Sequence, residues 1–310
     1  MSDATVFATP FAPRLFEQPA LPTALPGRYR IGMPQLGLNG LSESWLLAEC
    51  GDRHWQLLAQ ACGMPIAQLR DARKRRVYPA FRSVRLRHAE LDAVAENDVL
   101  EIASTLGRVS RTQFYSKHVV SAGHGQRAVV DMLSVFVVRE TAGVNTSAVR
   151  SAVPGFDAMP GLDEGERFAD HNRAWLQTRR EQDAARNGRP NHSYAPQLIR
   201  PCPSVHFNGA GFLYFARFHE LVDQAEAAWF GPAAAPCVTT ERHTLYHGNA
   251  DVGCALSLQL CEFERHGAQL RHHAQIVRND DHQVIADVTT RRRLRREGRG
   301  FLETLFEKAG

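Results

Sequence analysis

The segment NGAGFLYFARFHELVDQAEAAWFG, from Asn208 to Gly231, decides the fold, because the chain contains a second segment of the same design. That second segment is NGLSESWLLAECGDRHWQLLAQACG, from Asn39 to Gly63. Each begins with Asn-Gly, continues through an apolar stretch into a helical pattern and ends at Gly, and their lengths differ by one residue. This similarity predicts an internal repeat.

The later segment begins with FLYFARF, which we expect to be extended, and then becomes helical. We expect the helix to end at Gly231-Pro232. Four stretches typical of strands follow: HTLYHGN, CALSLQLCEFE, QLRHHAQIVR and QVIADVTTRRRL. One face of the helix carries apolar residues at helical spacing, namely Phe218, Leu221, Val222, Ala225 and Trp229.

The earlier segment leads to the same order of elements. We expect residues 39–49 to form a buried strand and Gly51-Asp52 to break the chain and begin a helix with Trp55, Leu58, Ala59 and Cys62 on one face. Four strand-like stretches follow, and they are VYPAFRSVRL, DVLEIASTLGRV, RTQFYSKHVV and AVVDMLSVFVV.

Two such units predict an α+β protein with a double hot dog fold, in which each of two fused units has a central helix wrapped by an antiparallel sheet. A single unit has an exposed sheet edge, and pairing two units edge to edge removes it. We expect a Pro-rich leader at 1–27, a first unit at 28–140, a polar linker with a short surface helix at 141–196 and a second unit at 197–310.

Composition excludes several classes of protein. The chain has 310 residues, of which 44% are hydrophobic and 23% charged, as is usual for a globular protein. We expect a cytoplasmic location, since neither a signal peptide nor an apolar run of membrane-spanning length is visible. The six cysteines form no CxxC pair and no zinc-like pattern, so we expect them to be reduced and expect no metal site.

The glycine turns before the two helices are the first candidate site. A turn that leads into a helix presents backbone N–H groups and the positive end of the helix dipole, which together can polarise a thioester carbonyl. Glycine allows a ligand to approach such a backbone closely, although the same glycines can equally be turn formers without a ligand. The candidate binding residues are Gly37, Asn39, Gly40, His206, Asn208 and Gly209.

Tyr78 and the basic run before it are the second candidate site. Tyr78 follows RDARKRR, and a phenol beside guanidinium groups is more easily ionised than one in water. Tyrosine at the start of a strand can also simply pack. The basic run can bind the phosphates of CoA or of a carrier protein through Arg73, Lys74, Arg75 and Arg76, and a second run, RRRLRREGR, begins at Arg291.

The stretches MPQLGLNGLSESWLLAECGDRHW, VYPAFRSVRL and above all HFNGAGFLYFARFHELVDQAEAAW resemble the double hot dog acyltransferase/decarboxylase family of polyketide β-alkylation pathways. The resemblance extends over both units. It implies uptake of methylmalonyl-CoA, transfer of the acyl group to an acyl carrier protein and loss of CO2. It also implies that Tyr78 is the catalytic residue, with no cofactor beyond the CoA thioester substrate.

One position departs from the pattern that the resemblance implies. We expect an acidic residue two positions before the Asn-Gly of the second unit, and this chain has His206 there. The role of Tyr78, as a nucleophile or as an acid that orients the thioester, stays open.

Two alternative functions remain. The first is a thioesterase or dehydratase of the same fold, which would need a carboxylate that neither glycine turn contains. The second is a non-catalytic module that binds carrier proteins. As partners we expect an acyl-CoA and an acyl carrier protein but neither nucleic acid nor a membrane, and the sequence leaves a homodimer open.

Overall fold

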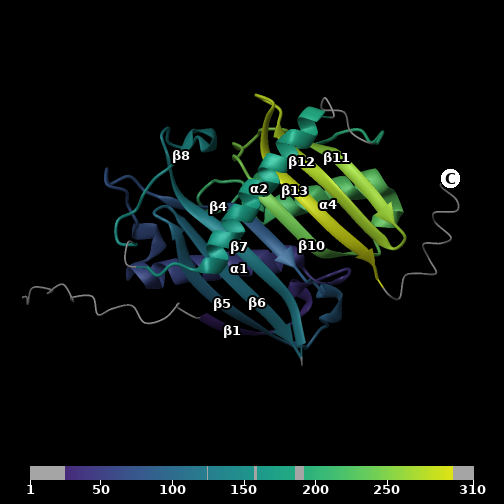
Figure 1. The fold of residues 1–310 in the computed structure, drawn as a ribbon, viewed down its shortest axis with the longest axis horizontal. Helices are drawn as coiled ribbons and strands as arrows, with labels where there is room; N and C mark the ends of the chain where they lie inside the picture. The colour runs from purple at the N-terminus through teal and green to yellow at the C-terminus, as the bar shows by residue number, and fades with distance from the viewer. Residues whose placement is uncertain (1–24, 124, 157–158, 186–191, 296–310) are drawn as a thin grey trace, which may run out of the picture.

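The structure is a computed structural model that describes residues 25–123, 125–156, 159–185 and 192–295 (Figure 1). The first half contributes the strands β1 (Leu25–Arg30), β4 (Tyr78–Arg87), β5 (Val99–Ser110), β6 (Gln113–Ala122), β7 (Gly125–Arg139) and β8 (Ala148–Arg150). The second half contributes β9 (Gln197–Ile199), β10 (Cys237–Tyr246), β11 (Leu256–His266), β12 (Gln269–Arg278) and β13 (Gln283–Leu294). Two short strands, β2 (Leu36–Gly37) and β3 (Gly40–Leu41), pair with each other.

The long strands form one antiparallel sheet in the order β1-β5-β6-β7-β4-β10-β13-β12-β11-β9, with β8 beside β7. The halves join where β4 pairs with β10, and Leu86 lies opposite Arg242 in that pairing. Each half therefore covers the sheet edge of the other, as expected from two fused units. The fold is a double hot dog, which confirms the prediction from sequence.

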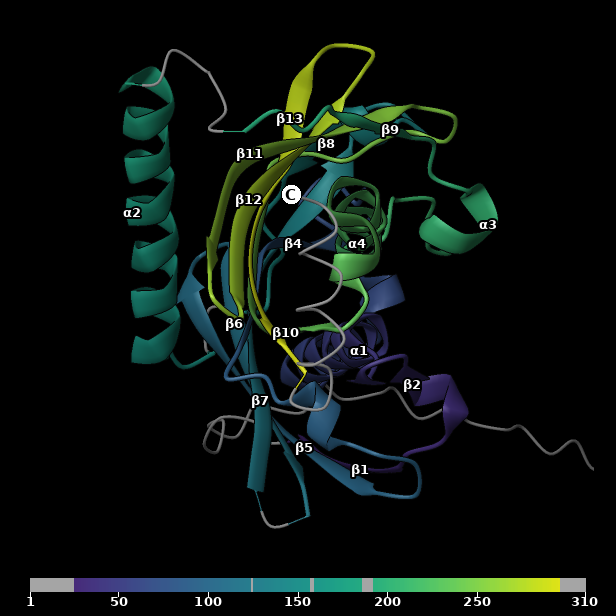
Figure 2. The ribbon, with the colours of Figure 1, turned by 90° about the vertical axis from the view of Figure 1, so that its right-hand side faces the viewer.

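Two helices cover one face of the sheet and a third covers the other (Figure 2). The central helices are α1 (Glu43–Cys62) in the first half and α4 (Arg217–Phe230) in the second, and α2 (Asp163–Ala185) lies across the opposite face. One hydrophobic core runs through both halves, because Leu46 of α1, Phe81 of β4 and Phe218 of α4 belong to the same buried cluster. The two units share their interior.

The predicted start of the first helix was wrong. Helix α1 begins at Glu43, where the Ser42 side chain caps it by accepting a hydrogen bond from the Trp45 backbone N–H at 3.3 Å. Gly51 and Asp52 lie inside the helix. Consequently only Gly40–Leu41 of the expected strand at 39–49 is extended, as β3, and most of the rest is helical. The buried face of α1 includes Leu46, Leu47, Cys50, Gly51, Leu57 and Leu58.

The remaining elements of the repeat agree better with the prediction. In α4 the five expected residues are all buried. Segments 269–278 and 283–294 are β12 and β13 with the expected bounds. FLYFARF is not a strand but a turn that leads into α4, with only Leu213 in a bridge, to Phe207. The end of the expected leader, from Leu25, already belongs to β1.

The segment between the units contains more structure than expected. Helix α2 is long, and Phe168 and Ala169 on it are buried against Tyr115 and Leu133 of the sheet. Gly165 allows this contact, since a Cβ there would lie 2.8 Å from the Cβ of Tyr115. Within the described ranges, no helix is both long and apolar enough to span a membrane.

Candidate active site

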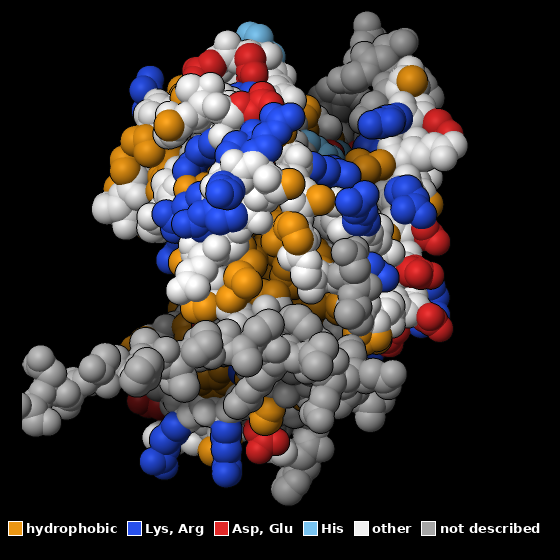
Figure 3. Space-filling model, turned by 90° about the vertical axis from the view of Figure 1, so that its left-hand side faces the viewer, with side chains coloured by type: hydrophobic (Ala, Val, Ile, Leu, Met, Phe, Trp, Pro, Cys, Tyr) orange, Lys and Arg blue, Asp and Glu red, His pale blue; other side chains and the backbone are white. Residues whose placement is uncertain are grey.

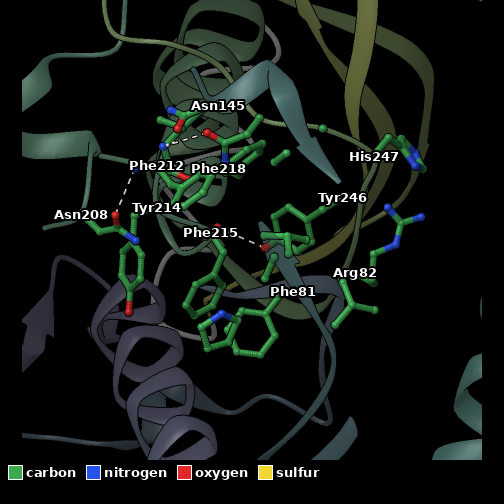
Figure 4. Close-up of a pocket in the computed structure, with 18 of the residues that line it drawn as sticks. Phe81, Arg82, Asn145, Asn208, Phe212, Tyr214, Phe215, Phe218, Tyr246 and His247 are labelled. Atoms are coloured by element: carbon green, nitrogen blue, oxygen red, sulfur yellow. Dashed lines mark hydrogen bonds between the residues drawn. The ribbon is translucent and has the colours of Figure 1, made fainter. Parts of the chain in front are cut away.

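A cavity of about 320 Å³ lies where the two units meet, between the start of β4, the end of β10 and the turn before α4. Aromatic side chains line its interior, among them Phe81, Phe215 and Tyr246 (Figure 4). Figure 4 shows Arg82 and His247 on one side of the cavity and Asn208 and Tyr214 on the other. Such a cavity suits a ligand that has an apolar part and a polar end.

The turn before α4 is held by its own asparagine. The Asn208 side chain accepts hydrogen bonds from the backbone N–H groups of Ala210 at 3.0 Å and Phe212 at 3.1 Å. Gly211 has a φ of 75°, which favours glycine. Asn249 continues the support, because its side chain both accepts from the Leu213 N–H and donates to the Leu213 carbonyl, each at 3.0 Å. The Asn-Gly pair noted in the sequence therefore marks a turn at the cavity.

Asn145, which was not predicted from sequence, ties three segments together at the cavity. Its amide donates to the carbonyls of Gly211 at 2.7 Å and Ala250 at 2.8 Å, and its oxygen accepts two hydrogen bonds from Arg139. Arg139 also donates to the carbonyl of Ala210. These bonds fix the turn relative to β7 and to the loop after β10.

The aromatic wall depends on a glycine of α1. A Cβ on Gly51 would lie 2.6 Å from the ring of Phe215, and Phe215 packs on Phe81 with ring centroids 4.3 Å apart. The phenol of Tyr246 donates to the Phe215 carbonyl at 3.1 Å. Helix α1 can thus approach the cavity closely only because residue 51 has no side chain.

His247 lines the cavity and has a carboxylate partner. It follows β10, and its Nε2 lies 2.7 Å from Oδ2 of Asp287 on β13. Burial acts to raise the pKa of Asp287, but the hydrogen bonds from His247 and His273 outweigh it, so the pKa of this carboxyl is lowered. Asp287 is therefore ionised, and as an anion it can only accept hydrogen bonds from its neighbours.

Two arginines at the cavity have no carboxylate partner within the described ranges. Arg82 and Arg150 both line the cavity, and no carboxylate is among the residues that line it. The pKa of Arg82 is lowered by burial and then by the charge of Arg150. Two neighbouring guanidinium groups without a counter-ion favour an anionic ligand. Figure 3 shows Lys and Arg side chains gathered on one face of the molecule.

Tyr78 is the first residue of β4 and lies beside the cavity, next to Pro79, which lines it. Its ring packs edge-on against Phe212 of the glycine turn, with centroids 5.2 Å apart. The guanidinium of Arg76 lies 5.1 Å from the ring centroid and that of Arg139 lies 5.0 Å from it. The structure thus brings Tyr78 to the turn of the second unit.

Tyr78 and Tyr246 do not occupy equivalent positions in the two units, although each lies on the strand that follows the central helix of its unit. Tyr78 begins β4, whereas Tyr246 ends β10. Because β4 and β10 run antiparallel beside each other, the start of one strand lies near the end of the other. Both tyrosines therefore belong to one cavity region, on which the two halves converge.

The predicted residues of the first unit lie elsewhere, at the place that corresponds to the cavity by the pseudo-twofold relation. The Asn39 side chain there donates to the carbonyls of Ala235 at 2.8 Å and Cys237 at 3.3 Å. Gly40 has a φ of 100°, and a Cβ on it would lie 2.2 Å from the carbonyl oxygen of Leu91. Gly37 lies in the same β2–β3 turn. Among the described residues, this second place therefore shows contacts within the chain.

Of the predicted residues of the second unit, Asn208 alone lines the cavity. His206 is buried, and its Nδ1 accepts a hydrogen bond from the Cys202 backbone N–H at 2.8 Å, so it supports the chain before the turn. Gly209 lies in the turn with nothing near the position of a Cβ.

The basic run divides into two pairs. Arg73 and Lys74 are exposed. Arg75 forms an ion pair with Asp71 at 2.8 Å, and Arg76 packs on Tyr78. In the second run, Arg291 pairs with Glu241, Arg292 with Asp223 and Glu226, and Arg293 with Asp92, so their charges are balanced within the molecule. The part of that run beyond residue 295 lies outside the described residues.

Comparisons with known proteins agree with this fold. No family model matches the sequence, and no curated protein sequence matches it. Three solved structures superpose over most of their length. A putative oleoyl thioesterase from Lactobacillus plantarum gives a TM-score of 0.61 at 12% identity, covering 89% of this chain and 98% of its own.

The other two structures are an acyl-ACP thioesterase from Bacteroides thetaiotaomicron and the 12:0-ACP thioesterase from Umbellularia californica. The first gives a TM-score of 0.58 at 9% identity and covers 87% of this chain and 97% of its own. The second gives 0.57 at 10% identity and covers 88% and 98%. Similarity at these identities establishes the fold.

Proposed function

We propose that this protein is an enzyme that cleaves acyl thioesters of CoA or of an acyl carrier protein. The observation that carries the proposal is the cavity itself, which joins an aromatic interior to a histidine–carboxylate pair and to two arginines that have no carboxylate partner among the described residues. Solved structures of the same fold are named as thioesterases, which supports this substrate class. The acyl group would lie against Phe81 and Phe215.

Hydrolysis is the reaction that this arrangement supports best. The thioester carbonyl would lie at the turn before α4, where the helix dipole favours the negative charge that develops on its oxygen. His247 would take a proton from water while the water oxygen bonds to the carbonyl carbon. When the C–S bond breaks, the electron pair stays on sulfur, and the thiolate takes the proton from His247.

The two cations suggest where the anionic part of the substrate binds. Arg82 and Arg150 can hold a carboxylate at the end of the acyl group or the phosphate of the pantetheine arm. Arg73 and Lys74 are exposed on the segment that leads to β4, where they can contact an acidic carrier protein.

Acyl transfer with decarboxylation is the second candidate, and the surroundings of Tyr78 favour it. Two guanidinium groups lie near its ring, which stands beside the turn that would hold an enolate oxygen. With methylmalonyl-CoA, the bond to the carboxylate breaks, CO2 leaves, and the electron pair moves to the enolate, which then takes a proton at carbon. The thiol of the carrier replaces that of CoA, giving a propionyl-carrier.

One experiment separates these reactions. The protein is incubated with malonyl-, methylmalonyl-, propionyl- and dodecanoyl-CoA, with and without a carrier protein in its phosphopantetheinyl form. Thiol release and the intact mass of the carrier are then measured. Free acid that disappears in His247→Gln supports hydrolysis, and a propionyl-carrier that disappears in Tyr78→Phe supports transfer. If all thioesters remain intact while the carrier still binds, the protein is a non-catalytic module and the proposal fails.

A further inference from the structure

Helix α2 lies on the face of the sheet opposite the central helices, yet a chain of hydrogen bonds connects it to the cavity. Asp287 stands at the centre of this chain, buried on β13. Its Oδ2 meets Nε2 of His247 at 2.7 Å, and its Oδ1 meets Nε2 of His273 at 2.7 Å. At the far end, Nη2 of Arg179 on α2 lies 2.8 Å from Nδ1 of His273.

The chemistry of these groups fixes the direction of every bond. A guanidinium can only donate, so Nδ1 of His273 accepts and its proton must be on Nε2. That Nε2–H donates to Asp287, which also accepts from Gln275 at 3.0 Å. Because the ionised Asp287 can only accept, Nε2 of His247 must carry a proton as well.

We propose that Arg179, His273 and Asp287 are positioning residues that hold His247 as the tautomer protonated on Nε2, which leaves Nδ1 as the nitrogen that takes up a proton. The inference rests on the proposed function only for the use of that nitrogen. Helix α2 then helps to position His247, because Arg179, the first donor in this series of hydrogen bonds, lies on it.

The surroundings of the chain support this role. Arg179 is itself held by an ion pair with Glu262 of β11 at 2.8 Å, and Trp175 of α2 packs edge-on against His273 with ring centroids 5.6 Å apart. The charged and titratable groups around Asp287 and His247 come from four elements and are His273 and Arg278 on β12, Arg179 on α2, Glu262 on β11 and Arg82 on β4.

The test uses the full-length protein labelled with ¹⁵N-histidine. Long-range ¹H–¹⁵N spectra report which ring nitrogen is protonated, and His247→Gln assigns the signals of His247. We expect the Nε2–H tautomer in the parent protein. In Asp287→Asn the amide can donate to Nε2, so we expect His247 to switch to the Nδ1–H tautomer.

Variants of α2 test the far end of the chain. We expect Arg179→Met to remove the donor to Nδ1 of His273, which frees that ring to change tautomer and shifts the ¹⁵N signals of both His273 and His247. Arg179→Lys, which keeps a donor, should restore the parental spectrum. Arg180→Met is the matched control, because Arg180 is the adjacent arginine on the exposed face of α2. It should change nothing.

The spectra decide the inference whether or not the protein turns over any thioester. An Nδ1–H tautomer in the parent protein would overturn the inference. A His247 signal that is the same in Asp287→Asn and Arg179→Met as in the parent would do so too. If the spectra behave as expected and thioesters are cleaved, the acid side of the kcat profile should follow the pKa of His247 in each variant, with KM nearly unchanged. Normal spectra without turnover would reject the proposed function and leave the chain of hydrogen bonds established.

Discussion

At the scale of single residues, the two tyrosines near the cavity are expected to behave differently. The Tyr78 ring lies near two guanidinium groups, whereas the Tyr246 phenol is buried and donates to a backbone carbonyl. We predict that Tyr78→Phe slows acyl transfer by more than 100-fold with an unchanged melting temperature. Tyr246→Phe should cost about 0.5–1.5 kcal/mol of stability and less than tenfold in rate. Steady-state kinetics and thermal melts of both variants check this, and equal rates for Tyr78→Phe and the parent would contradict it.

Arg82 tests what kind of substrate end the cavity accepts. We predict that Arg82→Met lowers kcat/KM for malonyl-CoA by about 10- to 150-fold, because a hydrogen bond to a charged group contributes about 1.5–3 kcal/mol. Propionyl-CoA shares the pantetheine phosphates but lacks the carboxylate. An equal loss for both substrates would assign Arg82 to the phosphate. Arg111→Met, on the exposed turn between β5 and β6, is the control and should leave both values unchanged.

At this scale, the sequence predicted a residue whose role depends on its neighbours in the chain and missed residues whose role depends on distant partners. Asn208 could be found because Asn-Gly marks a turn by itself. His247 could not be found in this way, because its role depends on a hydrogen bond to Asp287, which lies 40 residues further along the chain. One signal was present, since Asp287 is a lone carboxylate in the strand QVIADVTTRRRL, where a buried charge calls for a partner. Asn145 gave no local signal, because its three partner segments meet only in the fold.

At the scale of elements, the error at α1 has a physical cause. Gly51-Asp52 has the composition of a helix start, and glycine inside a helix costs about 1 kcal/mol relative to alanine. The structure compensates for this cost through packing, since the ring of Phe215 occupies the space where a side chain would be. Strands with regular alternation and the face of α4 were predicted correctly because their patterns repeat several times.

Gly51 therefore offers a test of how α1 shapes the cavity. We predict that Gly51→Val pushes the Phe215 ring into the cavity, raises KM for long acyl chains at least tenfold and costs about 1–3 kcal/mol of stability through overpacking. Gln60→Val, on the exposed face of the same helix, reports the cost of a β-branched residue alone. Acyl-chain profiles and urea unfolding measure both effects. A parental chain-length profile for Gly51→Val would mean that Phe215 does not limit the cavity.

At the scale of the whole molecule, buried histidines link stability to pH. Burial lowers the pKa of His118 and of His243 to about 3, and the pKa values of His54 and His219 lie well below their usual range. Unfolded histidine titrates near ~6.5, so the unfolded state binds protons that the native state does not. We predict that stability falls as pH drops below about 6.5, by about 1.4 kcal/mol per unit for each histidine.

Urea unfolding between pH 7.5 and 5 measures this slope. His118→Asn should reduce the slope by the contribution of one histidine, whereas His266→Asn, at an exposed position, should leave it unchanged. A flat profile in the parent protein would contradict the neutral state of the buried rings.

The exposed part of the basic run is expected to act over a longer range. We predict that Arg73→Glu with Lys74→Glu raises the KM for an acyl-carrier substrate several-fold at low salt, with the difference fading toward 0.5 M salt because exposed charges are screened. Arg75 is unsuitable for such a test, because its ion pair with Asp71 holds the turn. A KM that is insensitive to both the substitutions and salt would remove this surface from carrier binding.

The difference between the turns at Asn39 and Asn208 has a consequence for how this molecule can change over generations. A homodimer of two hot dog subunits expresses each substitution at both of its symmetric sites. Here Asn39 and Gly40 contact Ala235 and Leu91, while Asn208 and Gly211 form the turn at the cavity. Because the two halves are separate parts of one chain, a substitution in one half does not occur in the other. Selection can therefore change the turn before one central helix without changing the turn before the other.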